Sequence, residues 1–308
     1  MNANMINSGY FTRGAMVLTK AGYVEIQNVF VDELVLTHLS DWKPIISKQK
    51  QLFKGDTYTI NHIANSVPIT AISDQLFLVK TIHMTGLEPL SYRLSHDMSL
   101  VAAKDLQPHK HVLCSPVIQK LTPVNITISV NSELKIINKI DYFMVGYYVG
   151  KQGNFIDVEF VPPGWSILQE FTKHINPDSP TLCNTIPEWM QALPKNDLKD
   201  FVLGFESTAK VVSGKYNAIN ELVALSMQRI YAKIGVLTQI IIVGSCAFIE
   251  RAQDNMHGRF YIDNQYMYIP IKHIDSSITE QNIYQVEVAN ENSYVIENIA
   301  TSGTTQLE

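Results

Sequence analysis

Cysteine is the first residue type to consider, because a thiol can act as a nucleophile, bind zinc or form a disulfide. The three cysteines of the 308-residue chain, Cys114, Cys183 and Cys246, are widely separated and odd in number. None belongs to a CxxC pair, so the sequence predicts neither a disulfide framework nor a zinc site. Isolated, reduced thiols are typical of a cytosolic protein.

Charged side chains are the second group to consider, because lysine and arginine bind nucleic acid. The chain carries a net charge of -5, and only 17% of its residues are charged. Between Asn131 and Ile240, ten basic residues stand against eleven acidic ones. No net positive field is left to release counterions from a phosphate backbone, so we expect any DNA binding to be weak at physiological salt.

The elements that must position these residues are strands at both ends of the chain and helices in the middle. From Tyr10 to about Pro116, and again after about Val243, short β-branched runs alternate with turn residues. Between about Ser132 and Leu237 the apolar spacing becomes helical. The pattern predicts one β domain that is interrupted by an inserted α/β domain.

Several segments of the middle region carry the helical spacing. One consists of Leu134, Ile137, Ile140, Phe143 and Met144. A second consists of Leu198, Phe201, Val202 and Phe205. The clearest amphipathic helix begins near Ile219, and Gly235 is its expected stop.

The strand segments carry a resemblance to a known family. The stretch from Tyr10 to Thr19, then Gly22, then Val31 to His38 resembles the opening of an intein, or Hint domain. VAAKDLQPHKHVLCSP, which ends at Pro116, resembles a later stretch of the same family. YMYIPIKHI, followed by the segment from Ile283 to Thr304, resembles the closing part of inteins, where two strands bring the splice junctions together.

The middle region adds an independent resemblance. FMVGYYVGKQG, IPEWMQALPKNDLKDFVLGFESTAK and YNAINELVALSMQRIYAKIGV are similar to helices of LAGLIDADG homing endonucleases, in the family's order. The two resemblances together imply a multidomain fold. In it, an all-β Hint domain of horseshoe-like shape is interrupted by an α+β LAGLIDADG domain with two pseudo-twofold halves. The expected boundaries are 1–125 and 246–308 for the Hint domain and 126–245 for the insert.

The resemblance assigns the first splicing step to residues that cannot perform it. Inteins begin with a thiol or hydroxyl nucleophile, and that position falls on Tyr10. A phenol is bulky and nucleophilically poor near neutral pH, so Tyr10 is expected to be a half-buried aromatic at a strand start. The family's block B histidine falls on Gln75, which cannot exchange a proton near neutral pH.

The last splicing step is affected in the same way. Inteins end in His-Asn followed by Cys, Ser or Thr, and the matching residues are Ser302, Gly303 and Thr304. Only Thr304 is a permitted type, and Gly303 has no side chain with which to cyclise. The assisting Asp and His of the family fall on Gln285 and Asn292. We therefore expect no splicing.

The endonuclease chemistry would need one acidic residue at the foot of each LAGLIDADG helix, because the paired carboxylates hold a divalent metal. Lys151 and Gln152 stand at the first foot, while in the second motif Ser207 and Ala209 replace the aspartates and Lys210 replaces the final glycine. Glu206 lies a helical step away from the required direction. We expect no metal site and no cofactor, and Mg²⁺ only if cleavage has survived.

Helix packing, in contrast, is expected to be preserved. Gly146, Gly150 and Gly204 are small residues that would let the two helices approach closely. Lys151 and Lys210 would then lie near the lost metal site and could contact DNA phosphate. The alternative is that both are ordinary solvated lysines.

The resulting hypothesis is an intein-like protein that has lost both splicing and metal-dependent DNA cleavage, so whether it is an enzyme stays open. The alternatives are a repurposed DNA-binding module that does not cut, and a structural or interaction protein on the Hint scaffold. We expect a monomer with double-stranded DNA as a weak partner and no membrane association. The first residues lack a signal-peptide pattern, so the expected location is the cytoplasm or nucleus, without secretion.

Overall fold

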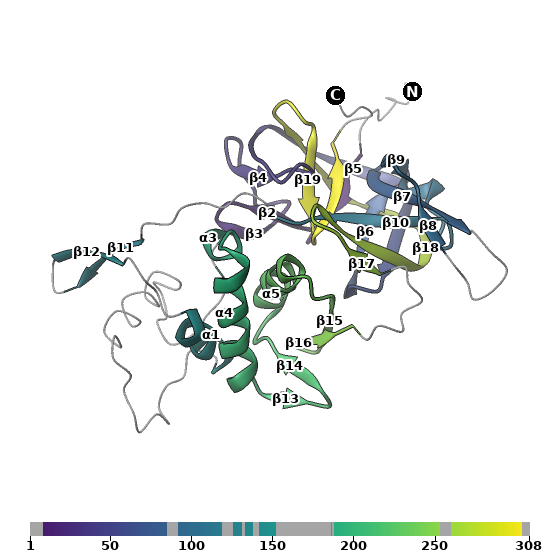
Figure 1. Ribbon diagram of the computed structural model, residues 1–308. Helices are drawn as coiled ribbons and strands as arrows, with labels where there is room; N and C mark the ends of the chain where they lie inside the picture. The colour runs from purple at the N-terminus through teal and green to yellow at the C-terminus, as the bar shows by residue number, and fades with distance from the viewer. Residues whose placement is uncertain are drawn as a thin grey trace. The chain divides into compact units, whose positions relative to one another are not determined.

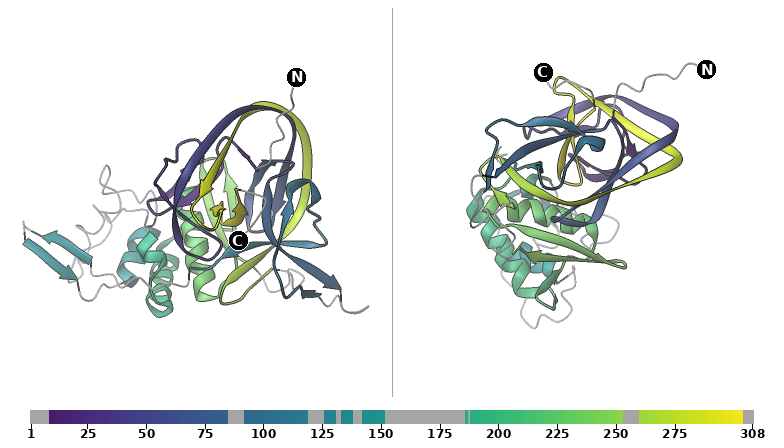
Figure 2. Two further views of the ribbon diagram at one scale, coloured as in Figure 1. Left: turned by 90° about the horizontal axis from the view of Figure 1, so that it is seen from above. Right: turned by 90° about the vertical axis from the view of Figure 1, so that its right-hand side faces the viewer.

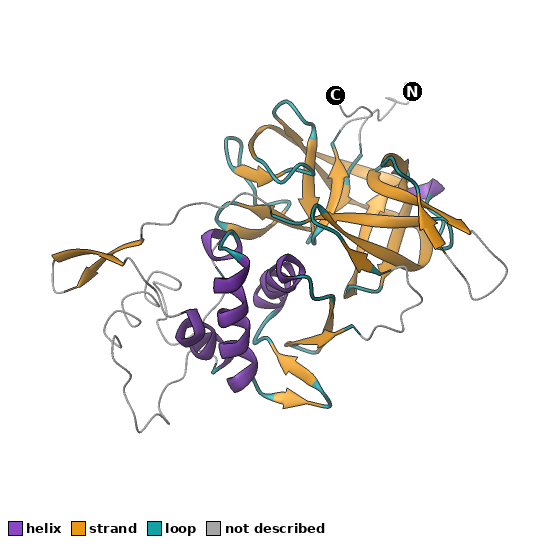
Figure 3. Cartoon of the chain, viewed as in Figure 1, coloured by secondary structure: helices purple, strands orange, loops and turns teal. Residues whose placement is uncertain are grey.

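A computed structural model describes residues 9–84, 92–118, 126–130, 133–137, 142–151, 186, 188–252 and 260–303. Most of these residues form strands (Figure 3). The chain divides into two compact units: unit 1 consists of Met1–Val117 with Ala252–Glu308, and unit 2 of Ile118–Arg251. Unit 1 is thus built from two stretches of chain that flank unit 2. The assignment of 1–125, 126–245 and 246–308 to family domains stays a prediction.

Two long strands run the length of unit 1. Strand β5 (Trp42–His62) pairs antiparallel with β18 (Tyr266–Val288), and the register runs from His62 opposite Ile271 to Ile45 opposite Val288. Figure 2 shows the two strands side by side, bent into an arch. Their ends are buried, whereas the polar middle of each strand is largely exposed. The middle is therefore a two-stranded ribbon with water on both faces.

Shorter strands complete the sheet of unit 1 (Figure 1). β1 pairs with β6 and β18, β7 pairs with β8, β9, β10 and β20, and β2 pairs with β3, β4 and β19. The bounds are β1 (Phe11–Thr12), β2 (Met16–Thr19), β3 (Gly22–Glu25), β4 (Leu34–Leu36), β6 (Asn65–Ile72), β7 (Leu76–Met84), β8 (Tyr92–Leu94), β9 (Ser99–Ala102), η1 (Ala103–Asp105), β10 (His111–Pro116), β17 (Tyr261–Ile262), β19 (Ser293–Ile296) and β20 (Ile299–Ser302).

The core of unit 1 joins strands from both stretches of chain. Phe11 of β1, Phe77 of β7 and Tyr294 of β19 are fully buried. The Phe11 ring meets Phe77 edge-on at 6.0 Å and Tyr294 at 6.2 Å. Burial of one such side chain contributes about 1.5–3 kcal/mol, and edge-to-face pairs add to that. The aromatic contacts hold β1 in place although it is only two residues long.

Unit 2 contains four strands that pair antiparallel with one another. Their order is β13 (Val211–Val212), β14 (Lys215–Asn217), β16 (Cys246–Arg251) and β15 (Thr238–Val243). The α-helices of the described residues all belong to unit 2 and are α1 (Tyr142–Gly150), α3 (Glu188–Gln191), α4 (Lys195–Thr208) and α5 (Glu221–Ile234). α5 contacts β15, β16 and α4.

The amphipathic helix expected near Ile219 is confirmed as α5. The side chain of Asn220 caps its start by accepting a hydrogen bond from the backbone N–H of Val223 at 2.8 Å. Gly235 ends it with a φ of 88°, in the left-handed region that glycine adopts without a steric penalty.

The prediction of a helix around Leu134 and Ile137 is wrong. Residues Glu133–Ile137 form β12, which pairs antiparallel with β11 (Ile126–Val130), and α1 begins only at Tyr142. Both segments are short and rich in isoleucine, which favours strands, and the spacing of a few apolar residues could not distinguish the two structures.

The close pairing expected of two helices is confirmed for α1 and α4, which lie side by side in Figure 1. A Cβ atom built at Gly146 would lie 1.8 Å from the carbonyl oxygen of Phe201. One built at Gly204 would lie 1.9 Å from the carbonyl oxygen of Phe143. Backbone contacts backbone at this crossing, so any side chain would force the helices apart.

Replacing Gly204 by alanine should therefore destabilise the protein. Alanine in an ordinary helix is more stable than glycine by about 1 kcal/mol. Here we expect the opposite sign, a loss of about 1–3 kcal/mol in the free energy of unfolding, because the new methyl group overpacks the crossing. Urea denaturation measures the change.

The matched control is Lys199→Ala on the exposed side of the same helix, where we expect a change within about 0.5 kcal/mol. Equal stability of Gly204→Ala and the unmodified chain would contradict the close crossing.

Candidate functional site

The two ends of unit 1 meet at Gln75. β1 begins after Tyr10 and pairs with β6 and β18, while β20 ends at Ser302, which lies opposite Leu76 of β7. A Cβ atom built at Gly9 would lie 2.4 Å from Gln75 Oε1, so the Gly9 backbone contacts this side chain directly. Gln75 Nε2 donates a hydrogen bond to the Ser302 carbonyl oxygen at 2.8 Å. We call Gly9, Tyr10, Gln75, Gln285, Ser302 and Gly303 the junction site.

Tyr10 is held as a core residue. It is 4% exposed and packs with Ile72, Ile283 and the partly buried Phe53. Its hydroxyl donates a hydrogen bond to Gln49 Oε1 at 2.8 Å. The phenolic oxygen lies at the far end of a rigid ring and is hydrogen-bonded to an amide, which cannot act as a base. The geometry gives this phenol no means of attacking the Gly9 carbonyl.

Gln75 is fully buried at the centre of the junction site. Besides its bond to Ser302, Nε2 donates to the Leu76 carbonyl oxygen at 2.9 Å. Oε1, which faces Gly9, has no hydrogen-bond partner among the described residues. The amide can orient the neighbouring peptide groups, but it has no proton to transfer near neutral pH.

The C-terminal side of the junction site is fixed by backbone interactions. The Ser302 hydroxyl donates to the Asn292 carbonyl oxygen at 2.9 Å, and the Gly303 N–H donates to the same oxygen at 2.9 Å. Gln285 Nε2 donates to the Gly303 carbonyl oxygen. The positions matched to the family's assisting residues therefore do contact the junction, one through its amide and the other through its backbone. Thr304 lies outside the described residues.

Gly303 has no room for a side chain. A Cβ atom at this position would lie 2.6 Å from the Val286 carbonyl oxygen, which is closer than real Cβ atoms approach. The backbone of β18 therefore occupies the space that a side chain at position 303 would need. An asparagine introduced here would require β18 to move.

One histidine near the junction was missed by the sequence reasoning. His38 Nδ1 lies 2.7 Å from Ser293 Oγ, and Ser293 is the strand partner of Ser302. Burial lowers the pKa of His38 below its usual value, against the opposing effect of Glu291, so the imidazole is neutral at pH 7. No sequence pattern could predict this contact, because His38 and Ser293 are 255 residues apart.

In unit 2, the helix-foot positions are brought together. A Cβ atom at Gly150 would lie 2.9 Å from the backbone nitrogen of Ala209, and the Thr208 hydroxyl donates to the Tyr147 carbonyl oxygen at 2.9 Å. Ala209 is buried, Lys151 is half-buried and Lys210 is exposed. Both lysines follow helix C-termini, where a positive charge interacts favourably with the helix dipole. Gln152 lies outside the described residues.

Glu206, the acidic residue nearest the foot of α4, is occupied. Its carboxylate accepts hydrogen bonds from Arg251 Nη2 at 2.6 and 2.7 Å, and from the Tyr231 hydroxyl at 2.7 Å. Burial, and then the Glu206 charge, raise the pKa of Tyr231, which keeps that hydroxyl a donor. The carboxylate is therefore a structural ion-pair partner. Within the described ranges, no cluster of three His, Cys, Asp or Glu side chains could hold a metal ion.

The described residues also contain no helix with the length and apolar character needed to cross a membrane.

Comparison with known proteins gives one kind of match. No protein-family model and no curated protein matches the sequence. Among solved structures, the chain is similar to the crystal structure of the gp41-1 intein, with 17% identity and a TM-score of 0.21. The match covers 30% of this chain and 80% of that one.

The tight packing at Gly303 generates a stability prediction. We expect Gly303→Ala to lower the free energy of unfolding by about 1–3 kcal/mol, because the methyl group meets a backbone oxygen that cannot rotate away. Urea unfolding of the full chain measures it.

Gly55→Ala is the matched control, because a Cβ there meets only the end of the Phe53 ring. A strand alanine that meets only the end of a partly buried side chain, and no backbone, should change stability by less than about 1 kcal/mol. If both variants are as stable as the unmodified chain, the contact between Gly303 and Val286 is not formed.

Proposed function

We propose that the chain is an intein-like protein that has lost autocatalytic splicing. The observation that supports this most strongly is the junction site, where Gly9–Tyr10 and Ser302–Gly303 converge on Gln75. Convergence of an N-terminal and a C-terminal peptide at one buried polar side chain is the arrangement that splicing requires. The residues at that arrangement are a phenol, an amide and a glycine, which provide neither nucleophile, proton donor nor cyclising side chain.

The proposal is supported by how the replacements fit. The Tyr10 ring packs among apolar side chains. The Gln75 amide donates hydrogen bonds to two carbonyl oxygens, and Gly303 lies against the Val286 backbone. Each replacement suits a folded, unreactive site. We infer that the fold of unit 1 is stabilised by the same positions that splicing would have used.

A fusion experiment tests this function. With the chain placed in frame between two marker proteins, we expect no ligated markers and no released fragments, because the first acyl shift has no nucleophile. Electrophoresis and mass spectrometry measure both. Ligated markers from the unmodified chain would refute the loss of splicing.

The double variant Tyr10→Cys/Gln75→His tests the geometry separately. Its thiolate can attack the Gly9 carbonyl carbon while the peptide C–N bond to residue 10 breaks, and a protonated imidazolium can give its proton to the departing nitrogen, leaving a thioester and a free amine. Added dithiothreitol should then release the N-terminal marker at least about tenfold faster than from the control Tyr10→Phe/Gln75→His. A folded double variant without this cleavage would contradict the junction assignment.

We further propose that unit 2 derives from a LAGLIDADG endonuclease without its metal site. The glycine-to-backbone crossing of α1 and α4 and the contact of Gly150 with Ala209 support this origin. The alternative of a DNA-binding module that does not cut depends on Lys151 and Lys210. Their places after two helix C-termini already provide a structural reason for the positive charges.

Restoring carboxylates at the helix feet tests the second proposal. Lys151→Asp/Ala209→Asp should bind Ca²⁺ with a dissociation constant on the order of 10⁻⁴–10⁻³ M, whereas the unmodified chain should show no binding in the same titration calorimetry.

Lys195→Asp/Lys199→Asp, which adds two carboxylates elsewhere on α4, is the control and should not bind. Circular dichroism confirms folding of each variant. A folded foot variant that binds no better than this control would contradict the convergence of the two positions.

A further inference from the structure

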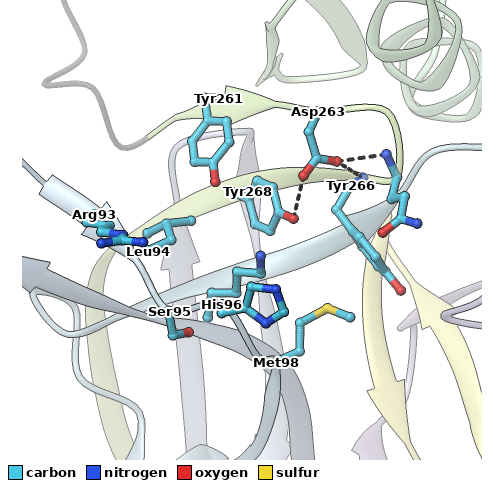
Figure 4. A pocket seen from close by; sticks show the side chains of 11 residues that line it. Arg93, Leu94, Ser95, His96, Met98, Tyr261, Asp263, Tyr266 and Tyr268 are labelled. Atoms are coloured by element: carbon cyan, nitrogen blue, oxygen red, sulfur yellow. Dashed lines mark hydrogen bonds between the residues drawn. The ribbon is translucent and has the colours of Figure 1, made fainter.

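A cavity of about 570 Å³ lies in unit 1, away from the residues of the junction site. Its walls come from β7, from the segment Arg93–Met98, and from the turn between β17 and β18. Figure 4 shows the side chains that surround the open space. This volume is within the range of small-molecule binding sites, roughly 300–1,000 Å³.

The cavity floor is apolar and well packed. Tyr266 and Tyr268 are buried members of a core cluster that also contains Cys114, and Tyr261 packs against them. The Tyr261 and Tyr268 rings lie 4.6 Å apart with an angle of 33° between their planes. Cys114 is fully buried in the core cluster and does not line the cavity, and burial raises the pKa of its thiol. The cavity therefore offers stacked aromatic surface.

Two basic side chains line the same cavity. Lys80 Nζ lies 5.0 Å from the centre of the Tyr268 ring, and Arg93 extends from β8 with an exposed side chain. Within the part of the chain that the structure describes, neither forms an ion pair with a carboxylate. His96 also lines the cavity, and its ring is hydrogen-bonded to Asp97, which does not line it.

The one carboxylate in the cavity wall is already satisfied. Asp263 accepts hydrogen bonds from the backbone N–H groups of Gln265 and Tyr266 and from the Tyr268 hydroxyl, at 2.7, 2.8 and 2.8 Å (Figure 4). Burial acts to raise its pKa, but these hydrogen bonds and the Lys80 charge hold the pKa below its usual value. Asp263 therefore stays ionised and fixes the Tyr268 phenol. Two cations against one carboxylate leave a net positive charge in the cavity.

We propose that this cavity binds a small ligand with one flat aromatic ring and an anionic group, of the size of a nucleoside monophosphate or a substituted benzoate. The ring would stack on the partly buried Tyr261, and the anion would bind the guanidinium of Arg93 with the ammonium of Lys80. Stacking needs a π-face, and Arg93 offers two parallel donors to a carboxylate or phosphate. The inference does not depend on the proposed function, because none of its residues belongs to the junction site.

Titration calorimetry on the full chain with four probes tests it. Adenosine monophosphate and 4-hydroxybenzoate carry both features, adenosine lacks the anion, and inorganic phosphate lacks the ring. We expect at least one of the first two to bind about tenfold more tightly than adenosine and phosphate. Comparison of the first two distinguishes a nucleotide ligand from an aromatic acid.

Two variants connect binding to the cavity. Arg93→Gln, an exposed change, should weaken binding about tenfold, and Tyr261→Leu should weaken it by a similar factor. The control is Arg13→Gln, an equally exposed arginine of unit 1 that does not line the cavity. Absence of binding by every probe, binding of phosphate or adenosine as tight as that of the better of the two ring-bearing anions, or binding unchanged by Arg93→Gln would overturn the proposal.

Discussion

The hydrogen bond from Gln75 to the Ser302 carbonyl joins the two stretches of chain that form unit 1, between residues 227 positions apart in sequence. Its surroundings are dry, and a buried polar group that loses its partner costs about 1–3 kcal/mol. The backbone of both ends must therefore stay in register with this amide. Glutamine satisfies that demand well, and it excludes proton transfer at the same point. The Gln75 side chain thus supports the structure by hydrogen bonding but cannot take part in proton transfer.

Unit 2 shows the same separation of structural support from chemistry at a different kind of contact. The crossing of α1 and α4 depends on the absence of side chains at Gly146 and Gly204, and no substitution can be absorbed there without moving a helix. A few residues further on, the feet of the helices carry Lys151 and Ala209, which are compatible with packing and incompatible with a divalent cation. Packing therefore restricts the size of the side chains at the crossing of α1 and α4, whereas it does not require metal-binding residue types at the feet of the two helices.

Local features could be predicted from the sequence because their causes are local. α5 has a cap at Asn220 and a stop at Gly235, and both lie within one turn of the helix they limit. The segment around Leu134 was assigned wrongly, because a handful of apolar residues fits either periodicity. The paired helices followed from a family pattern, and their contact is present in the structure.

The remaining features depend on contacts between distant segments. His38 reaches Ser293 only because β4 and β19 both pair with β2, and Lys80 meets Tyr268 only because β10 lies between β7 and β18. No composition or spacing in one sequence encodes such neighbours. The cavity lined by Lys80 and Arg93 could therefore not be predicted from the sequence, because it depends on the order of the strands.

The pairing of β5 with β18 has a consequence for the order of events during synthesis. β5 leaves the ribosome long before its partner, since all of unit 2 is translated between them. Closing that interval as an unstructured loop would cost about 4 kcal/mol of chain entropy. Early folding of the intervening unit would replace the loop by a compact body. During this interval the edge of β5 that pairs with β18 has no partner, and an unpaired strand edge is where nascent chains most readily associate with one another.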